Sequence, residues 1–115
     1  MIPVTSSERD DLDVLHSFLQ EPLHHCDGIM ERFGDLPGAY AFGESPERFV
    51  YVPGTREDRV VLVAHADTVW QGFRKIETRV VLDENEGCSR SLSPRYGIGA
   101  DDRAGCAILD RKSVV

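Results

Sequence analysis

Cysteine is scarce in this sequence of 115 residues, whose three thiols are Cys26, Cys88 and Cys106. They are odd in number and widely spaced, and no Cys-x-x-Cys pair occurs. This pattern argues against a disulfide framework as the basis of the fold. It predicts a reduced, cytoplasmic compartment.

Long apolar runs and a targeting segment are also missing. No stretch approaches the roughly 20 apolar residues that span a bilayer. Residues 1–13 contain four acidic side chains, whereas a signal peptide carries an apolar run of about 7–15 residues. We therefore expect no membrane span and no signal or transit peptide.

Basic residues are outnumbered, because 13 Lys and Arg stand against 20 Asp and Glu, for a formal net charge of −7. This charge repels nucleic acid phosphates and anionic lipid surfaces, so neither is expected as a partner. The apolar fraction of 41% is enough for a globular core. We expect a single domain over residues 1–115.

The apolar spacing predicts two helices followed by β structure. The first helix has possible caps at Ser6 and Ser7, apolar side chains at helical spacing over residues 12–19, and an end at Pro22. Apolar side chains recur in the same way over residues 23–33, which predicts the second helix. Residues 49–52 predict a short strand. Residues 60–64 have no polar alternation, which predicts a strand covered on both faces, as in the middle of an α/β sheet.

The second half of the chain continues this mixed pattern. Residues 76–82 predict a strand that forms a hairpin with the residues after Gly87. Residues 89–96 predict a loop, and a short helix is expected from Ala104. Together these elements predict an α/β fold.

His65 and Asp67 follow the strand predicted over residues 60–64. Being two positions apart, they point to the same side if the strand continues, at the edge where open α/β sheets bind ligands. A histidine that binds metal through one nitrogen needs an acceptor for the other ring N–H, and Asp67 is placed to be that group. Taken alone, this pair is better explained as a polar strand end followed by a turn.

A second acidic cluster, Asp101 and Asp102, lies in the glycine-rich segment of residues 97–105. The glycines permit tight turns, and carboxylates at a helix start interact favourably with the helix dipole. The alternative is an ordinary helix N-cap. A phosphate-binding Gly-x-Gly-x-x-Gly loop is discarded because Asp102 occupies the third glycine position and would repel a phosphate.

Residues 61–69 (VLVAHADTV) resemble the His-x-Asp segment of the zinc-dependent exopeptidases with two co-catalytic metals. That superfamily includes peptidase T, glutamate carboxypeptidase, the acetylornithine deacetylase group and the glutamyl aminopeptidases. Residues 99–106 (GADDRAGC) resemble its second signature, in the same order along the chain. The resemblance covers residues 49–109, and it implies the N-terminal part of a three-layer α/β/α catalytic domain with a mostly parallel central sheet.

The resemblance implies a role for each acidic residue. His65 would be a ligand to one zinc, and Asp67 would be the catalytic-site group that orients it. Asp101 would bridge both metals, and Asp102 would support it through a cis Asp101–Asp102 peptide. In such enzymes the two metals lower the pKa of a shared water and polarise the scissile carbonyl of a small peptide or N-acyl amino acid.

The general-base glutamate and the later ligands of the family lie beyond the second signature, and residues 103–115 contain no His and no Glu. We therefore expect a truncated metallopeptidase-like domain that binds at most one zinc, weakly, instead of the two of a complete site. Its exposed sheet edges would favour self-association.

Two alternatives remain open from the residues alone. One is a non-catalytic remnant that binds a partner chain or at most one weakly held metal. The other is a mononuclear metal hydrolase that draws ligands from His16, His24 or His25. The adjacent pair His24 and His25 would diverge by about 100° on a helix, so it does not converge on one ion.

Overall fold

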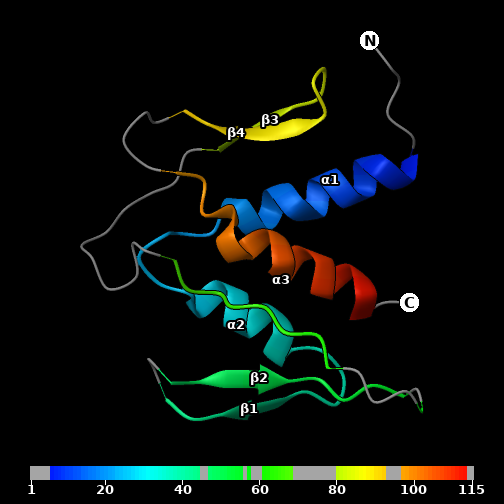
Figure 1. The fold of residues 1–115 in the computed structure, drawn as a ribbon, viewed down its shortest axis with the longest axis vertical. Helices are drawn as coiled ribbons and strands as arrows, with labels where there is room; N and C mark the ends of the chain where they lie inside the picture. The colour runs from blue at the N-terminus through cyan, green and yellow to red at the C-terminus, as the bar shows by residue number, and fades with distance from the viewer. Residues whose placement is uncertain are drawn as a thin grey trace.

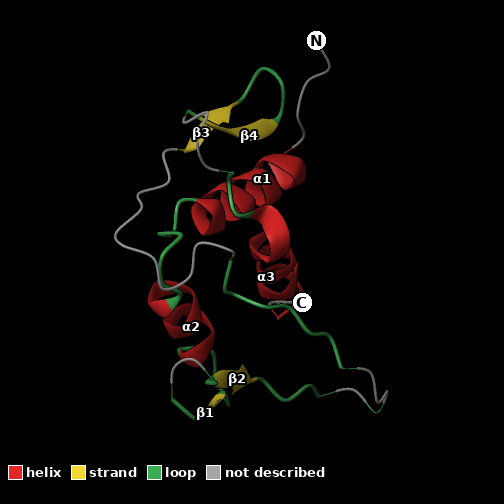
Figure 2. Cartoon of the chain, turned by 60° about the vertical axis from the view of Figure 1, so that its left-hand side comes forward, coloured by secondary structure: helices red, strands yellow, loops and turns green. Residues whose placement is uncertain are grey.

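The computed structural model describes residues 6–44, 47–55, 57, 61–68, 80–92 and 97–113. Its helices and strands are α1 (Ser6–Leu19), α2 (Asp27–Gly34), β1 (Tyr40–Phe42), β2 (Phe49–Tyr51), β3 (Val80–Asp83), β4 (Cys88–Ser91) and α3 (Ala100–Ser113). The described chain is therefore a mixed α/β structure. The strand pairs lie at opposite ends of it, with the helices between them (Figure 1, Figure 2).

Helix α1 begins at Ser6, one of the predicted caps, and ends before Pro22, and its apolar stripe faces the core. Phe18 and Leu19 are 0% and 2% exposed. Phe18 joins Ile29 of α2 with Cys106 and Ala107 of α3 in the main apolar cluster. None of the helices in the described ranges combines the length and apolarity of a membrane span.

Helix α2 begins at Asp27, later than the predicted range of residues 23–33. The His25 carbonyl accepts a hydrogen bond from the Arg103 guanidinium at 3.1 Å. The Asp27 N–H bonds to the His25 ring at 3.3 Å, where a helix would use a carbonyl one turn earlier. The residues before Asp27 are therefore held by tertiary contacts in a non-helical path.

The sheets of the described chain are two antiparallel pairs, β1 with β2 and β3 with β4. The mostly parallel central sheet is not formed by these residues, which corrects that part of the expectation. Residues 61–64 form no strand, and position 60 lies outside the described residues. Val61, Leu62 and Val63 are 74%, 58% and 83% exposed. The physical reason is that an apolar strand is covered on both faces only when strands flank it, and no described strand pairs with this segment.

The hairpin expected around Gly87 is confirmed for residues 80–82, which belong to β3, whereas residues 76–79 lie outside the described residues. Gly87 adopts a φ of +64° in the turn. Residues 89–91 belong to β4, which corrects the loop predicted there; residues 93–96 lie outside the described part. The residues of β4 are polar and have no apolar alternation that would predict a strand. The strand is formed through its pairing with β3.

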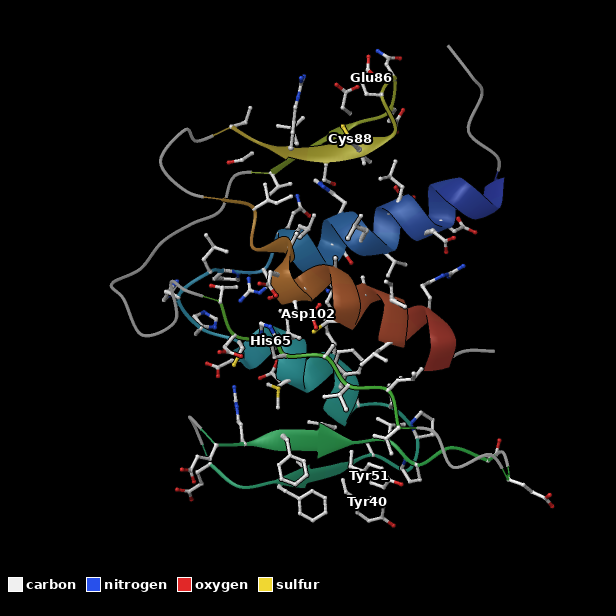
Figure 3. All side chains as sticks on the ribbon, in the orientation of Figure 1. Tyr40, Tyr51, His65, Glu86, Cys88 and Asp102 are labelled. Atoms are coloured by element: carbon white, nitrogen blue, oxygen red, sulfur yellow. The ribbon has the colours of Figure 1, made fainter. Side chains whose placement is uncertain are left out.

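Strand β1 was not predicted, and its pairing with β2 creates an aromatic face. Tyr40 lies opposite Tyr51 and Phe42 opposite Phe49. Directly opposed side chains of antiparallel strands project from the same face. These four rings are 57%, 49%, 46% and 56% exposed, in the order just named. Figure 3 shows Tyr40 and Tyr51 on the hairpin, on the side away from α2.

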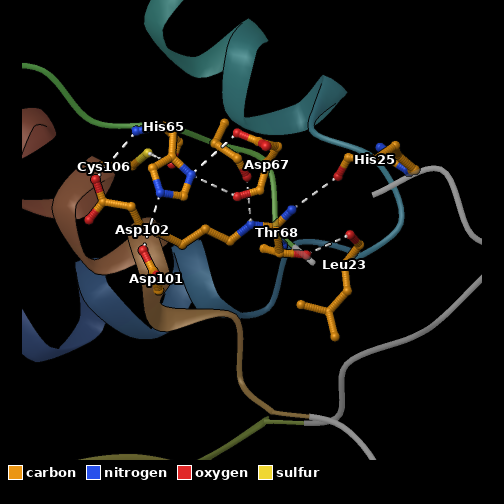
Figure 4. Close-up of polar contacts among 10 residues, drawn as sticks. Leu23, His25, His65, Asp67, Thr68, Asp101, Asp102 and Cys106 are labelled. Carbon is orange, nitrogen blue, oxygen red and sulfur yellow. Dashed lines mark hydrogen bonds and ion pairs between the residues drawn. The ribbon is translucent and has the colours of Figure 1, made fainter. Parts of the chain in front are cut away.

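Helix α3 contains an irregular start. Asp101 (φ −91°, ψ 100°) and Asp102 (φ −122°, ψ 34°) are non-helical. The continuous helix therefore follows Asp102, close to the start predicted at Ala104. This break turns the two carboxylates out of the helix at the end that approaches residues 61–68 (Figure 4).

Candidate functional site

The imidazole of His65 lies between two aspartates (Figure 4). Its Nε2 is 3.1 Å from Oδ1 of Asp101, which is 36 residues further along the chain. Its Nδ1 is 3.0 Å from the backbone carbonyl oxygen of Asp67 and 3.3 Å from the Asp67 carboxylate. The expected proximity of His65 and Asp101 is confirmed, and the Asp101–Asp102 peptide bond is cis, as the resemblance implies.

Side chains of α3 hold the main chain at His65 and Ala66. Asp102 Oδ2 accepts a hydrogen bond from the His65 N–H at 3.3 Å. The Cys106 thiol donates to the His65 carbonyl at 3.4 Å, and Arg103 Nε donates to the Ala66 carbonyl at 3.1 Å. These contacts satisfy backbone groups that a flanking strand would otherwise satisfy. Asp102 therefore supports His65 through the main chain.

Two glycines permit this close approach. Gly99 has a φ of +73°, and a Cβ placed there would lie 2.6 Å from Cδ2 of Leu23. A Cβ at Gly105 would lie 2.3 Å from Oδ1 of Asp102. The glycines on either side of the acidic pair thus leave room for the packing of α3 and for the Asp102 carboxylate.

The electrostatics of His65 follow from its neighbours. Desolvation lowers the pKa of His65, but the hydrogen bond to the Asp67 carbonyl and the charges of Asp67 and Asp101 outweigh it, so the pKa lies above its ordinary value of 6.5. The stabilisation from the contacts of protonated His65 is therefore fully present at pH values below the unfolded-state pKa. This contribution is lost as the pH rises through the folded-state pKa. It is screened by solvent, because the Asp101 side chain is 96% exposed.

His65 Nε2 and the Asp101 carboxylate are the donors that could share a zinc ion. A catalytic zinc site uses about three protein ligands and one open position. Within the described ranges, no group of three or more His, Cys, Asp and Glu side chains is arranged to hold a metal ion. The described donors therefore match part of a zinc site and not a complete one.

The histidines considered for a mononuclear site have other contacts. His16 Nδ1 lies 3.0 Å from the Ser89 hydroxyl of β4. The rings of His24 and His25 meet edge to face with centroids 4.5 Å apart. Because the part of the chain that the structure describes holds no group of three ligands, these contacts give no support to the mononuclear alternative.

Arg103 is the residue at the site that sequence reasoning missed. It is 0% exposed and is the largest of the fully buried side chains. Burial lowers the pKa of its guanidinium, and the electrostatic effects of Cys26 and Glu21 partly oppose this. One feature of the sequence could have indicated its burial. Arg103 precedes Cys106 by three residues and Ala107 by four, which places it on the same face of α3 as these two buried residues.

Three comparisons with known proteins were made. A scan against protein-family models, a search of curated proteins and a search of solved structures each found no match. Assignment of a function therefore depends on the residues and their geometry.

Proposed function

We propose that residues 49–109 form part of a zinc-dependent hydrolase of peptide or amide bonds, similar to the two-metal exopeptidases. His65 and Asp101 are the proposed ligands, and Asp67 is the proposed orienting group. The observation that carries the proposal is the His65 ring, with Nε2 3.1 Å from Asp101 and Nδ1 against Asp67. A histidine ligand is typically held in this way, with its second nitrogen bonded to a carboxylate or carbonyl.

The proposed fold of the whole catalytic unit is a three-layer α/β/α domain with a mostly parallel central sheet. Support comes from residues 61–64, an apolar segment directly before the site. Val61 and Val63 are 74% and 83% exposed, and such side chains are buried when strands flank the segment and helices cover the sheet. Pairing of this segment with further strands would cover them.

The chemistry proposed for this chain alone is limited. Zinc, when bound, would supply a Lewis acid and a water of lowered pKa. His65 and Asp101 would hold one ion weakly, because two ligands are fewer than a catalytic site uses. In a complete site of this kind two ions would act on a small peptide or an N-acyl amino acid.

Zinc titration by calorimetry tests the proposed ligands. We expect one weak site per chain, with affinity that falls as the pH is lowered because protons compete for the histidine. His65→Ala and Asp101→Asn should each weaken binding by at least about tenfold, the scale seen when a supporting metal contact is lost. His24→Ala is the matched control and should leave the affinity unchanged. Unchanged binding in His65→Ala would refute the proposed ligand.

A partner-binding role is the second candidate, and the exposed aromatic face of β1 and β2 favours it. Phe42 and Phe49 stack with centroids 5.0 Å apart, yet they are 46% and 56% exposed. Contiguous apolar patches of this kind mark interaction surfaces on soluble proteins. We propose that the partner is a second copy of this chain, through this face and the edges of the hairpin, which pair with no other strand of the described residues.

Sedimentation velocity over a range of concentrations tests self-association. Replacing both rings (Phe42→Thr with Phe49→Thr) should weaken association by more than about tenfold, since each buried Phe contributes roughly 1.5–3 kcal/mol. Threonine keeps the strand propensity. Ile108→Gln, which removes a side chain that is 60% exposed on α3, is the control. Salt should strengthen association, because it screens the repulsion between chains of net charge −7. A concentration-independent monomer would contradict the proposal.

A further inference from the structure

The buried guanidinium of Arg103 connects three segments of the chain at the candidate site. Nε donates to the Ala66 carbonyl at 3.1 Å. One terminal nitrogen donates to the Glu21 carbonyl at 2.8 Å, and the other donates to the His25 carbonyl at 3.1 Å. All three nitrogens therefore have carbonyl acceptors, in the segment before α2 and in the segment that carries His65.

The position of these acceptors matters for the site. Ala66 lies between His65 and Asp67, so fixing its carbonyl limits the movement of both neighbours. Arg103 itself follows Asp101 and Asp102 directly, so it moves with the carboxylates. The planar guanidinium of one side chain thus links the two halves of the site.

We propose that Arg103 is the positioning residue of the candidate site, holding the His65 segment at the distance from α3 that sets Nε2 against Asp101. This inference rests on the proposed function, because the distance between His65 Nε2 and Asp101 matters for zinc binding only if these two groups are ligands. The positioning role also requires the planar fork of the guanidinium. A lysine is a flexible point charge and does not present three nitrogens in one plane to three carbonyls.

A comparison of variants tests this role. In Arg103→Lys we expect loss of the nuclear Overhauser effect between the His65 ring and the Asp101 β-protons of the metal-free protein. We also expect zinc affinity to fall by at least about tenfold, as for loss of a group that orients a ligand. Thr68→Val is the matched control, because the Thr68 hydroxyl also links these segments by donating to the Leu23 carbonyl at 3.2 Å. It should leave both readouts unchanged.

The outcomes separate this inference from the proposed function. If the wild type binds no zinc but Arg103→Lys alone loses the Overhauser effect, the positioning role stands and the proposed function fails. If Arg103→Lys keeps the effect and the zinc affinity, the positioning role is overturned. Should this variant not fold, Arg103→Gln, which keeps a planar amide with two N–H donors, is measured instead. Failure of both to fold while Thr68→Val folds would overturn the role in favour of a general structural one.

Discussion

We expect the 115-residue chain to hydrolyse neither dipeptides nor N-acyl amino acids at a measurable rate, with or without added zinc. The carboxylate of Asp67 contacts the His65 ring, and that of Asp102 contacts the His65 main chain. Both carboxylates are thus engaged with His65, and within the described residues no group of three or more His, Cys, Asp and Glu side chains is arranged to hold a metal ion. Lack of a general base alone would cost roughly 10²–10⁴-fold in rate, and incomplete metal coordination would add to this loss.

The measurement is a chromatographic assay of released amino acids over a panel of dipeptides and N-acetyl amino acids. Wild type, His65→Ala and His24→Ala are compared at matched protein and zinc concentrations. All three should be indistinguishable from buffer. Turnover by the wild type that survives in His24→Ala and disappears in His65→Ala would show that a complete catalytic site exists in this chain. The proposed limit on its activity would then be wrong.

Replacing Gly99 by alanine should destabilise the protein by about 2–5 kcal/mol. A residue with a side chain costs roughly 1–2 kcal/mol in the left-handed region, and Gly99 has a φ of +73°. The new Cβ would also lie 2.6 Å from Cδ2 of Leu23. Leu23 is 0% exposed, so its side chain can yield only by disturbing the core, at about 1–3 kcal/mol.

Gly87→Ala separates these two contributions. Gly87 has a φ of +64°, but a Cβ there would have no atom within 4 Å. It should therefore show the backbone cost without the steric cost. Urea unfolding of wild type and both variants measures the difference, which we expect to be about 1–3 kcal/mol in favour of Gly87→Ala. Equal destabilisation of the two variants would mean that Leu23 yields freely.

Local patterns were sufficient for the elements that depend on neighbours along the chain. The capping serines and Pro22 predict where α1 begins and ends, and its apolar spacing predicts its buried face, where Phe18 is 0% exposed. The turn at Gly87 predicts the hairpin of β3 and β4. Such elements are specified within a few residues, because helix periodicity and turn conformation are local properties.

The errors arose where distant contacts overrode a local pattern. Residues 23–26 have helical spacing, but they are not helical in the structure. There the Arg103 guanidinium donates to the His25 carbonyl. Residues 61–64 have the composition of an interior strand, yet Val63 is 83% exposed. Burial of a strand depends on the strands beside it, and that information does not lie within the segment.

The sequence by itself indicated four residues of the candidate site, because the spacing of His65 and Asp67 and the acidic pair Asp101 and Asp102 between glycines can be read directly. Only the tertiary structure decided that His65 Nε2 meets Asp101 at 3.1 Å across 36 residues. It also decided that Arg103 is buried and bonds to the Glu21 carbonyl, 82 residues away. The physical reason is that a charged guanidinium is buried only when acceptors converge on it, and the spacing along α3 does not say which carbonyls of distant segments supply them.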